Sequence, residues 1–164
     1  MDWLEEQLYE PVAEHFRSKG YVVYREAKVA GRWCDLLAVG SDIVAVELKV
    51  RDWRTALAQA KSYQLGAHYA LVAMPLDHVF PAIRFRDRFE KDGVGLLAVS
   101  TPIGGVRTLI EPQASPRLMP FVLDGVLSGG DGKSGKPVKR RKVPVVVVQG
   151  FEQMHECDPS RLSH

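Results

Sequence analysis

Residues 42–50 read Asp42-Ile43-Val44-Ala45-Val46-Glu47-Leu48-Lys49-Val50, an apolar run with two charged side chains near its end. Its β-branched residues predict a strand, in which successive side chains point to opposite faces of a sheet. Glu47 and Lys49 would then lie on the same face. Because burying an unpaired charge is costly, the run predicts either an internal ion pair or a site for a metal ion and a charged substrate.

The segments around this run predict a mixed sheet. Residues 21–29 and 33–39 are rich in β-branched and aromatic residues, so with residues 42–50 they predict a three-stranded meander. Residues 52–67 have helical periodicity, with Asp52 as the N-cap. Residues 69–74 form a nearly continuous apolar strand, which favours parallel pairing across that helix.

The remaining segments complete the expected order αβββαβαβ. Residues 2–19 carry apolar side chains every four positions and predict an amphipathic first helix. A basic segment, residues 79–91, precedes a strand over residues 93–100, and residues 106–110 could extend that strand as a hairpin. This order predicts an α/β fold with a mixed central sheet flanked by helices.

Length and composition favour one domain with an appended segment. The chain has 164 residues, of which 46% are hydrophobic, enough for one core. We expect the core over residues 1–112 and a flexible extension, rich in proline and glycine, over residues 113–164. The extension contains a basic run at residues 139–142 and a strand-like run at residues 145–148. The latter could join the sheet edge or pair with another chain, which leaves a homodimer open.

Charge, cysteine content and hydropathy exclude several classes. The net charge of +2 neither requires nor rules out a polyanionic partner. Two isolated cysteines, Cys34 and Cys157, do not indicate a disulfide framework, and His155 with Cys157 is too little for a zinc site. No apolar run reaches the roughly 18 residues of a membrane span, and the N-terminus is acidic where a secretory signal would be basic. We therefore expect a cytoplasmic protein without a membrane partner.

Four charged residues interrupt the apolar patterns: Glu5, Asp35, Glu47 and Lys49. Asp35 and Glu47 fall on adjacent strands of the expected meander, where two carboxylates repel unless one is protonated or a cation lies between them. Oxygen ligands favour Mg²⁺ or Mn²⁺, which also bind substrate phosphates. Glu5 falls within the apolar stripe of the first helix, whereas Glu6 does not; a first-turn carboxylate that favours the helix dipole explains Glu5 about equally well.

This arrangement resembles the PD-(D/E)XK superfamily of restriction-endonuclease-like nucleases. The resemblance covers residues 1–100 and rests on a glutamate in the first helix, Asp35, the run Glu47-Leu48-Lys49, and a following helix with Gln59 and Tyr63. It implies an αβββαβ core in which the carboxylates of Asp35 and Glu47 bind metal. Cys34 stands where the family name has proline. Glu26 is a further candidate for an outer role, although a solvated strand residue is the simpler interpretation.

The resemblance implies hydrolysis of DNA by an Mg²⁺-dependent nuclease, most simply an endonuclease, with Mn²⁺ able to substitute. Asp35, Glu47 and the backbone carbonyl of Leu48 would hold the metal, and Lys49 would position the attacking water. Glu5, Gln59 and Tyr63 would support the site. The alternative is a noncatalytic nucleic-acid-binding or assembly module of the same fold, and an RNA substrate is a third possibility that the sequence does not exclude. Phosphate contacts are expected from basic residues near the site and in the extension, namely Lys49, Arg51, Arg54, Lys61, Lys139, Arg140, Arg141 and Lys142.

Overall fold

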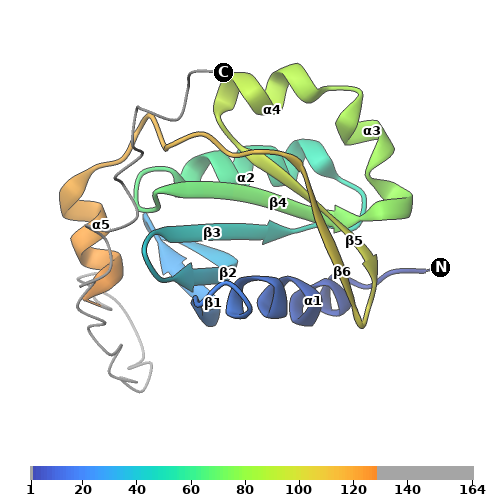
Figure 1. The fold of residues 1–164 in the computed structure, drawn as a ribbon. Coiled ribbons are helices and arrows are strands. Elements are labelled where there is room, and N and C mark those ends of the chain that lie inside the picture. Colours follow the sequence, from blue (N-terminus) through green and yellow to red (C-terminus); the bar gives the residue numbers. More distant parts are fainter. Residues whose placement is uncertain (1, 129–164) are drawn as a thin grey trace, which may run out of the picture.

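Six strands of the computed structural model, which describes residues 2–128, form one mixed sheet in the order β1-β2-β3-β4-β5-β6 (Figure 1). Strands β1, β2 and β3 are antiparallel, β3 pairs in parallel with β4, β4 pairs in parallel with β5, and β5 and β6 form an antiparallel hairpin. The predicted meander and the parallel crossover are thus confirmed. The strands are β1 (Val22–Val29), β2 (Arg32–Val39), β3 (Ile43–Leu48), β4 (Tyr69–Pro75), β5 (Gly95–Thr101) and β6 (Gly104–Ile110).

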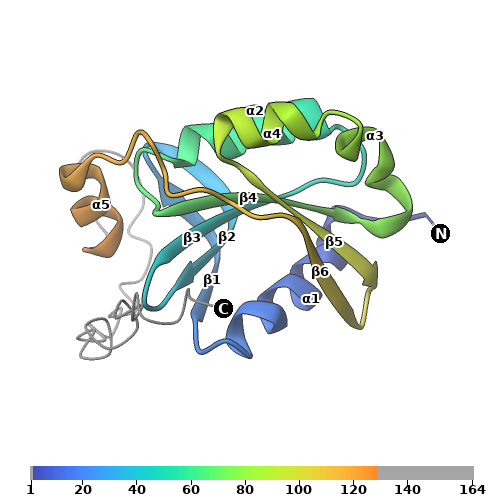
Figure 2. The ribbon, with the colours of Figure 1, turned by 45° about the horizontal axis from the view of Figure 1, so that its top comes forward.

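Helices cover both faces of the sheet, as Figure 2 shows. Helix α1 (Glu5–Arg17) packs on one face through Leu8, Val12 and Phe16. Helix α2 (Trp53–Tyr63) lies on the other face, where Trp53, Ala56 and Leu57 join the core. The chain between β4 and β5, where the expected element order has one helix, forms η1 (Leu76–His78), α3 (Phe80–Ile83) and α4 (Arg86–Asp92).

Strand β3 is buried over its whole length and follows the alternation expected of a strand. Val44, Val46 and Leu48 contact the core under α1, whereas Ile43 and Ala45 contact a cluster that includes Tyr63 of α2. The strand ends at Leu48, so Lys49 lies beyond it. Lys49 follows it directly, and its N–H still donates a hydrogen bond of 3.0 Å to the Ala73 carbonyl of β4.

Helix α5 (Pro120–Leu127) lies in a region that the sequence pattern assigns to a linker. Leu123 and Val126 pack against the third core cluster, and a Cβ added at Gly66 would lie 3.0 Å from a methyl of Val122. The preceding loop is tied to the core by the backbone N–H groups of Gln113, Ser115 and Met119. Residues 113–128 therefore belong to the ordered unit.

Several predictions concern residues outside the described range. They are the basic run of residues 139–142, the strand-like run of residues 145–148, and His155 and Cys157. Between residues 2 and 128, no helix has both the length and the apolar character needed to cross a membrane.

Candidate active site

Asp35 and Glu47 lie where strands β2 and β3 separate. The pairing of these strands ends at Leu36 and Val46, one residue short of the two carboxylates. The Leu48 N–H donates a hydrogen bond of 2.7 Å to Asp35 Oδ2, so a side chain takes the place of a β2 carbonyl. Because a buried N–H needs an acceptor, this bond fixes the Asp35 carboxylate beside the end of β3.

Glu47 is almost fully buried and is held from the α2 side of the sheet. Only 4% of its surface is exposed. The Tyr63 hydroxyl lies 2.6 Å from Glu47 Oε2 and 2.7 Å from the carbonyl oxygen of Trp33. Since a phenol has one proton, it can donate to only one of these oxygens at a time. Tyr63 thus supports Glu47 directly, as the family resemblance leads one to expect.

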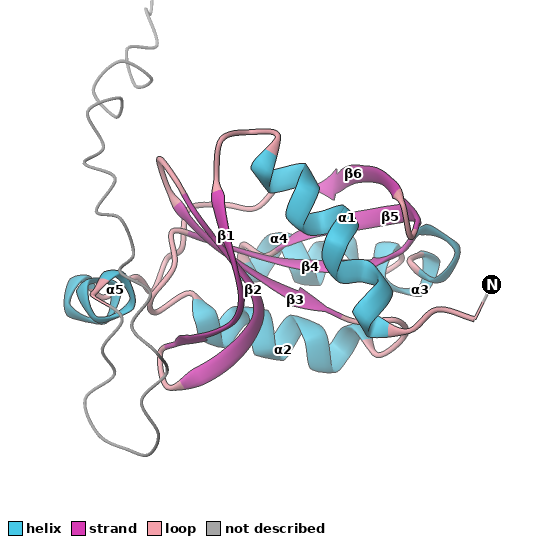
Figure 3. Ribbon diagram, turned by 90° about the horizontal axis from the view of Figure 1, so that it is seen from below, coloured by secondary structure: helices cyan, strands magenta, loops and turns pink. Residues whose placement is uncertain are grey.

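Lys49 forms an ion pair with Glu5, the first residue of α1, rather than with Glu47. The distance from Lys49 Nζ to Glu5 Oε1 is 3.1 Å, and the Glu5 side chain is 52% exposed. Glu5 is thus a half-exposed first-turn carboxylate, as the alternative interpretation expects, and its side chain reaches the site. Figure 3 shows how α1 crosses the face of the sheet from which this contact is made.

A cavity of about 240 Å³ opens beside Asp35 between α1, β1 and β2. Its lining is rich in carboxylates, of which that of Glu6 lies 3.5 Å from an Arg25 nitrogen. Glu26 of β1 has a left-handed backbone with φ of 52°. It lies opposite Asp35, between the cross-strand pairs Arg25–Leu36 and Ala27–Cys34. Such a conformation is uncommon for a non-glycine residue. The lining residues are Glu5, Glu6, Tyr9, Arg25, Glu26, Asp35 and Leu48.

The site holds acidic groups in an environment that disfavours their ionisation. Burial, opposed by the Tyr63 hydrogen bond and assisted by the charge of Asp35, raises the pKa of Glu47 to about 7. Burial also raises the pKa of Asp35, against the effect of the Leu48 N–H. Burial alone would lower the pKa of Lys49, but its contact with Glu5 and the nearby carboxylates raise it overall. A cation close to Asp35 and Glu47 would favour the ionised form of both carboxyls.

Two neighbouring side chains, Cys34 and Gln59, make no direct contribution to the carboxylate pair. Burial raises the pKa of Cys34 to about 12, so its thiol stays protonated at neutral pH. Gln59 lies one helical turn before Tyr63, but its buried Oε1 has no hydrogen-bond partner among the described residues. Gln59 is therefore near the site without being joined to Glu47.

The basic residues expected to bind phosphate divide into two groups. Lys61 is engaged in an ion pair with Asp92 at 3.2 Å. Arg51 and Arg54 are exposed in the segment that follows Lys49. Lys139, Arg140, Arg141 and Lys142 lie outside the described range.

The donor set suits a hard cation better than zinc. Within residues 2–128, no group of three or more histidine, cysteine, aspartate and glutamate side chains is placed to bind a metal ion. Asp35 and Glu47 each use one oxygen, with the Leu48 N–H and the Tyr63 hydroxyl respectively, which leaves a second oxygen on each carboxylate. Mg²⁺ commonly takes one or two carboxylates and completes its shell with water and phosphate. Asp35 and Glu47 would therefore give such an ion at most two side-chain ligands, and water and phosphate would have to complete its shell.

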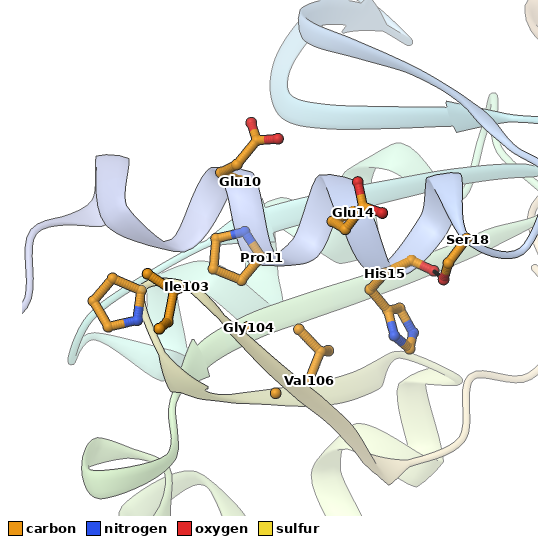
Figure 4. A pocket seen from close by; sticks show the side chains of 10 residues that line it. Glu10, Pro11, Glu14, His15, Ser18, Ile103, Gly104 and Val106 are labelled. Carbon is orange, nitrogen blue, oxygen red and sulfur yellow. Dashed lines mark hydrogen bonds between the residues drawn. The ribbon is translucent and has the colours of Figure 1, made fainter.

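A second cavity, of about 490 Å³, lies between α1 and the turn that joins β5 to β6 (Figure 4). It shares no lining residue with the cavity beside Asp35. Glu10 and Glu14, which line it, both lie near Arg17, at 2.6 and 3.9 Å. This larger cavity therefore contains neither Asp35 nor Glu47.

Comparison with known proteins gives one structural likeness. No protein-family model matches the chain, and no curated protein matches it. The solved structure of SPO1766, a protein of unknown function from Silicibacter pomeroyi, is similar with a TM-score of 0.60 and 20% sequence identity. The match covers 79% of this chain and 85% of that one, so the two share a fold.

Proposed function

We propose that this protein is a Mg²⁺-dependent nuclease of the restriction-endonuclease-like fold that hydrolyses phosphodiester bonds in DNA. The observation that carries the proposal is the pair Asp35 and Glu47, two desolvated carboxylates at the point where β2 and β3 separate, with Lys49 adjacent. The element order, with α1 before the meander and α2 before the parallel strand β4, agrees with the αβββαβ core of that fold.

The roles of the residues follow from their contacts. Asp35, Glu47 and the carbonyl of Leu48 would hold the metal ion, which when bound supplies a more acidic water and offsets charge on the phosphate. Tyr63 keeps the buried Glu47 carboxylate oriented through its hydrogen bond. Lys49 would orient the attacking water and stabilise developing negative charge, while Glu5 holds its ammonium group at the site. The attack requires no covalent intermediate on the protein.

The acidic lining of the cavity favours catalysis over simple binding. Glu5, Glu6 and Glu26 surround Asp35, and carboxylates repel a phosphate backbone in the absence of a cation. A module that only binds nucleic acid gains nothing from such a cluster. A metal-dependent enzyme benefits from the cluster, because the carboxylates attract divalent cations.

One observation favours the alternative, a noncatalytic nucleic-acid-binding module of the same fold. Lys49 and Glu47 already have partners, Glu5 and Tyr63, so the charges are partly satisfied without a ligand. In such a module Asp35 would serve only as the acceptor for the Leu48 N–H. The two functions differ in whether metal-dependent cleavage occurs.

The experiment is incubation of the full chain with plasmid, single-stranded and branched DNA, and with RNA, in Mg²⁺, Mn²⁺ or EDTA. We expect cleavage with either metal, no cleavage in EDTA, and a rate lower by about a hundredfold or more for Asp35→Asn and Lys49→Met. Asp124→Asn, which alters an exposed carboxylate of α5, is the matched control and should cleave like wild type. Activity in EDTA, or equal rates in all variants, would refute the proposal. Tight binding without cleavage would favour the module.

A further inference from the structure

A layered group of aromatic and arginine side chains lies beside the start of α2. The buried ring of Phe89 contacts Trp53 at a centroid distance of 6.0 Å, and Trp53 stacks on Phe85 at 4.9 Å with planes 27° apart. The Phe85 ring is 38% exposed. The result is a ring at the surface that is supported from below by two buried rings.

Arginine side chains lie over these rings. The Arg54 guanidinium is 4.5 Å from the Trp53 ring centre and 5.3 Å from that of Phe85, and the Arg88 guanidinium is 5.9 Å from Phe85. Phe80 is the first residue of α3 and is 66% exposed. Arg84 follows one turn later, and its N–H donates to the Phe80 carbonyl. We call this set, Arg54, Phe80, Arg84, Phe85 and Arg88, the aromatic–arginine patch.

The cations of the patch are available to a ligand. Nearby basic residues are used internally: Arg86 contacts Glu90 and the Leu109 carbonyl, and Lys61 contacts Asp92. Among the described residues, by contrast, no acidic side chain forms an ion pair with Arg54, Arg84 or Arg88. Exposed aromatic rings next to such cations give a surface complementary to a polyanion that carries flat apolar groups.

The patch lies at the same end of the sheet as the candidate active site. Figures 1 and 2 show α3 and the start of α2 at the end where β3 finishes and α1 begins. Trp53 follows Lys49 by only four residues, so their Cα atoms are at most about 14 Å apart. A nucleic-acid strand bound near Lys49 could therefore continue onto the patch.

We propose that the aromatic–arginine patch binds single-stranded nucleic acid, with bases stacked on Phe85 and Phe80 and phosphates held by Arg54, Arg84 and Arg88. Duplex bases are already stacked on one another, so they cannot use exposed rings, whereas unpaired bases can. This assignment rests on the proposed nuclease function and deepens it, because it gives the nuclease a substrate with an unpaired segment next to the cleaved bond.

The test measures binding without cleavage. The full chain is titrated in EDTA against labelled oligonucleotides of equal length: a thymidine tract, an abasic tract with the same phosphates, and a blunt-ended duplex of two annealed strands. Each stacked base contributes about five- to a hundredfold in affinity, so we expect the thymidine tract to bind at least tenfold more tightly than the abasic tract. Phe80→Ala and Phe85→Leu should leave the affinity for the duplex unchanged, because its paired bases do not reach the rings.

Variants separate stacking from charge. Phe80→Ala and Phe85→Leu should remove most of the preference for thymidine over abasic DNA and leave abasic binding unchanged, while thermal unfolding verifies that both variants fold. Arg84→Gln with Arg88→Gln should weaken binding of both tracts and lower the salt dependence, by a slope of about 0.7 for each phosphate that is no longer neutralised. Phe121→Ala changes a ring that is 69% exposed on α5 and should have no effect.

The outcomes distinguish this proposal from the nuclease proposal. Equal affinity for thymidine and abasic tracts, or no binding of either, would overturn the patch as a stacking surface, whether or not the protein cleaves DNA with Mg²⁺. A preference for the thymidine tract that Phe80→Ala and Phe85→Leu leave intact would also overturn it. Base-dependent binding that these variants abolish would support the patch even in a protein that cleaves nothing.

Discussion

Replacing Glu47 by glutamine should stabilise the metal-free protein above neutral pH. Burial raises the pKa of this carboxyl from 4.5 to about 7. Between pH 4.5 and about 7, the folded protein therefore keeps this carboxyl protonated, whereas the unfolded chain has released the proton. Stability from this group is present at low pH and is lost as the pH rises through 7. The difference corresponds to about 3 kcal/mol, because a tenfold change in proton affinity is about 1.4 kcal/mol.

Glutamine resembles the neutral carboxyl in shape and can still accept the Tyr63 hydrogen bond. Urea unfolding in EDTA at pH 5, 6, 7 and 8 measures the effect. Wild type should lose up to about 3 kcal/mol from pH 5 to 8 relative to Glu47→Gln, which should be the more stable of the two at pH 8. Asp124→Asn serves as the control for an exposed carboxylate. Parallel pH profiles of wild type and Glu47→Gln would refute the assignment of a desolvated, partly protonated carboxyl at this position.

Metal binding, the Tyr63 hydrogen bond and the packing of Gly95 give three further predictions. Mg²⁺ at pH 8 should raise the unfolding temperature of wild type but not of Glu47→Gln or Asp35→Asn, and an equal rise in all three would show binding elsewhere. Tyr63→Phe removes a donor from a buried carboxylate and should cost about 1.5–3 kcal/mol at pH 8 but less at pH 5, where the carboxyl is protonated; equal losses in urea unfolding at both pH values would contradict the contact. Gly95→Ala should lose about 1–3 kcal/mol in urea unfolding, since its Cβ would lie 2.9 Å from the Ile110 carbonyl and 2.7 Å from Leu71; unchanged stability would show that β5 can shift.

The sheet could be predicted because its strands leave strong local signals. The apolar run from Ile43 to Leu48 and that of residues 69–74 are buried as their patterns require, and a parallel pair follows from the helix between them. Asp35 was recognisable as a carboxylate within such a run. Its proximity to Glu47 followed from the short connections of the meander.

The partners of the charged residues could not be predicted in the same way. Period-two alternation places Lys49 on the face of Glu47, but it does not reveal that the ammonium group pairs with Glu5. The contact with Glu5 depends on how α1 crosses the sheet, which is a tertiary feature. Glu26 gave no local signal, since its positive φ arises where β1 meets β2 opposite Asp35. Helix α5 was missed because proline and glycine residues in and around it resemble a linker, although Pro120 occupies the first turn, where proline is tolerated.

The separation of β2 from β3 explains how a sheet core can carry this site. Were pairing to continue past Leu36 and Val46, a β2 carbonyl would take the Leu48 N–H and the Asp35 side chain would have no buried donor. At this point Leu48 lines the cavity, and Asp35 accepts the hydrogen bond of the N–H that has no β2 carbonyl. The same opening places two carboxyls where burial raises the pKa of both, and the charge of Asp35 raises that of Glu47 further. That arrangement destabilises the metal-free fold at neutral pH, so a divalent cation would contribute to stability as well as to chemistry.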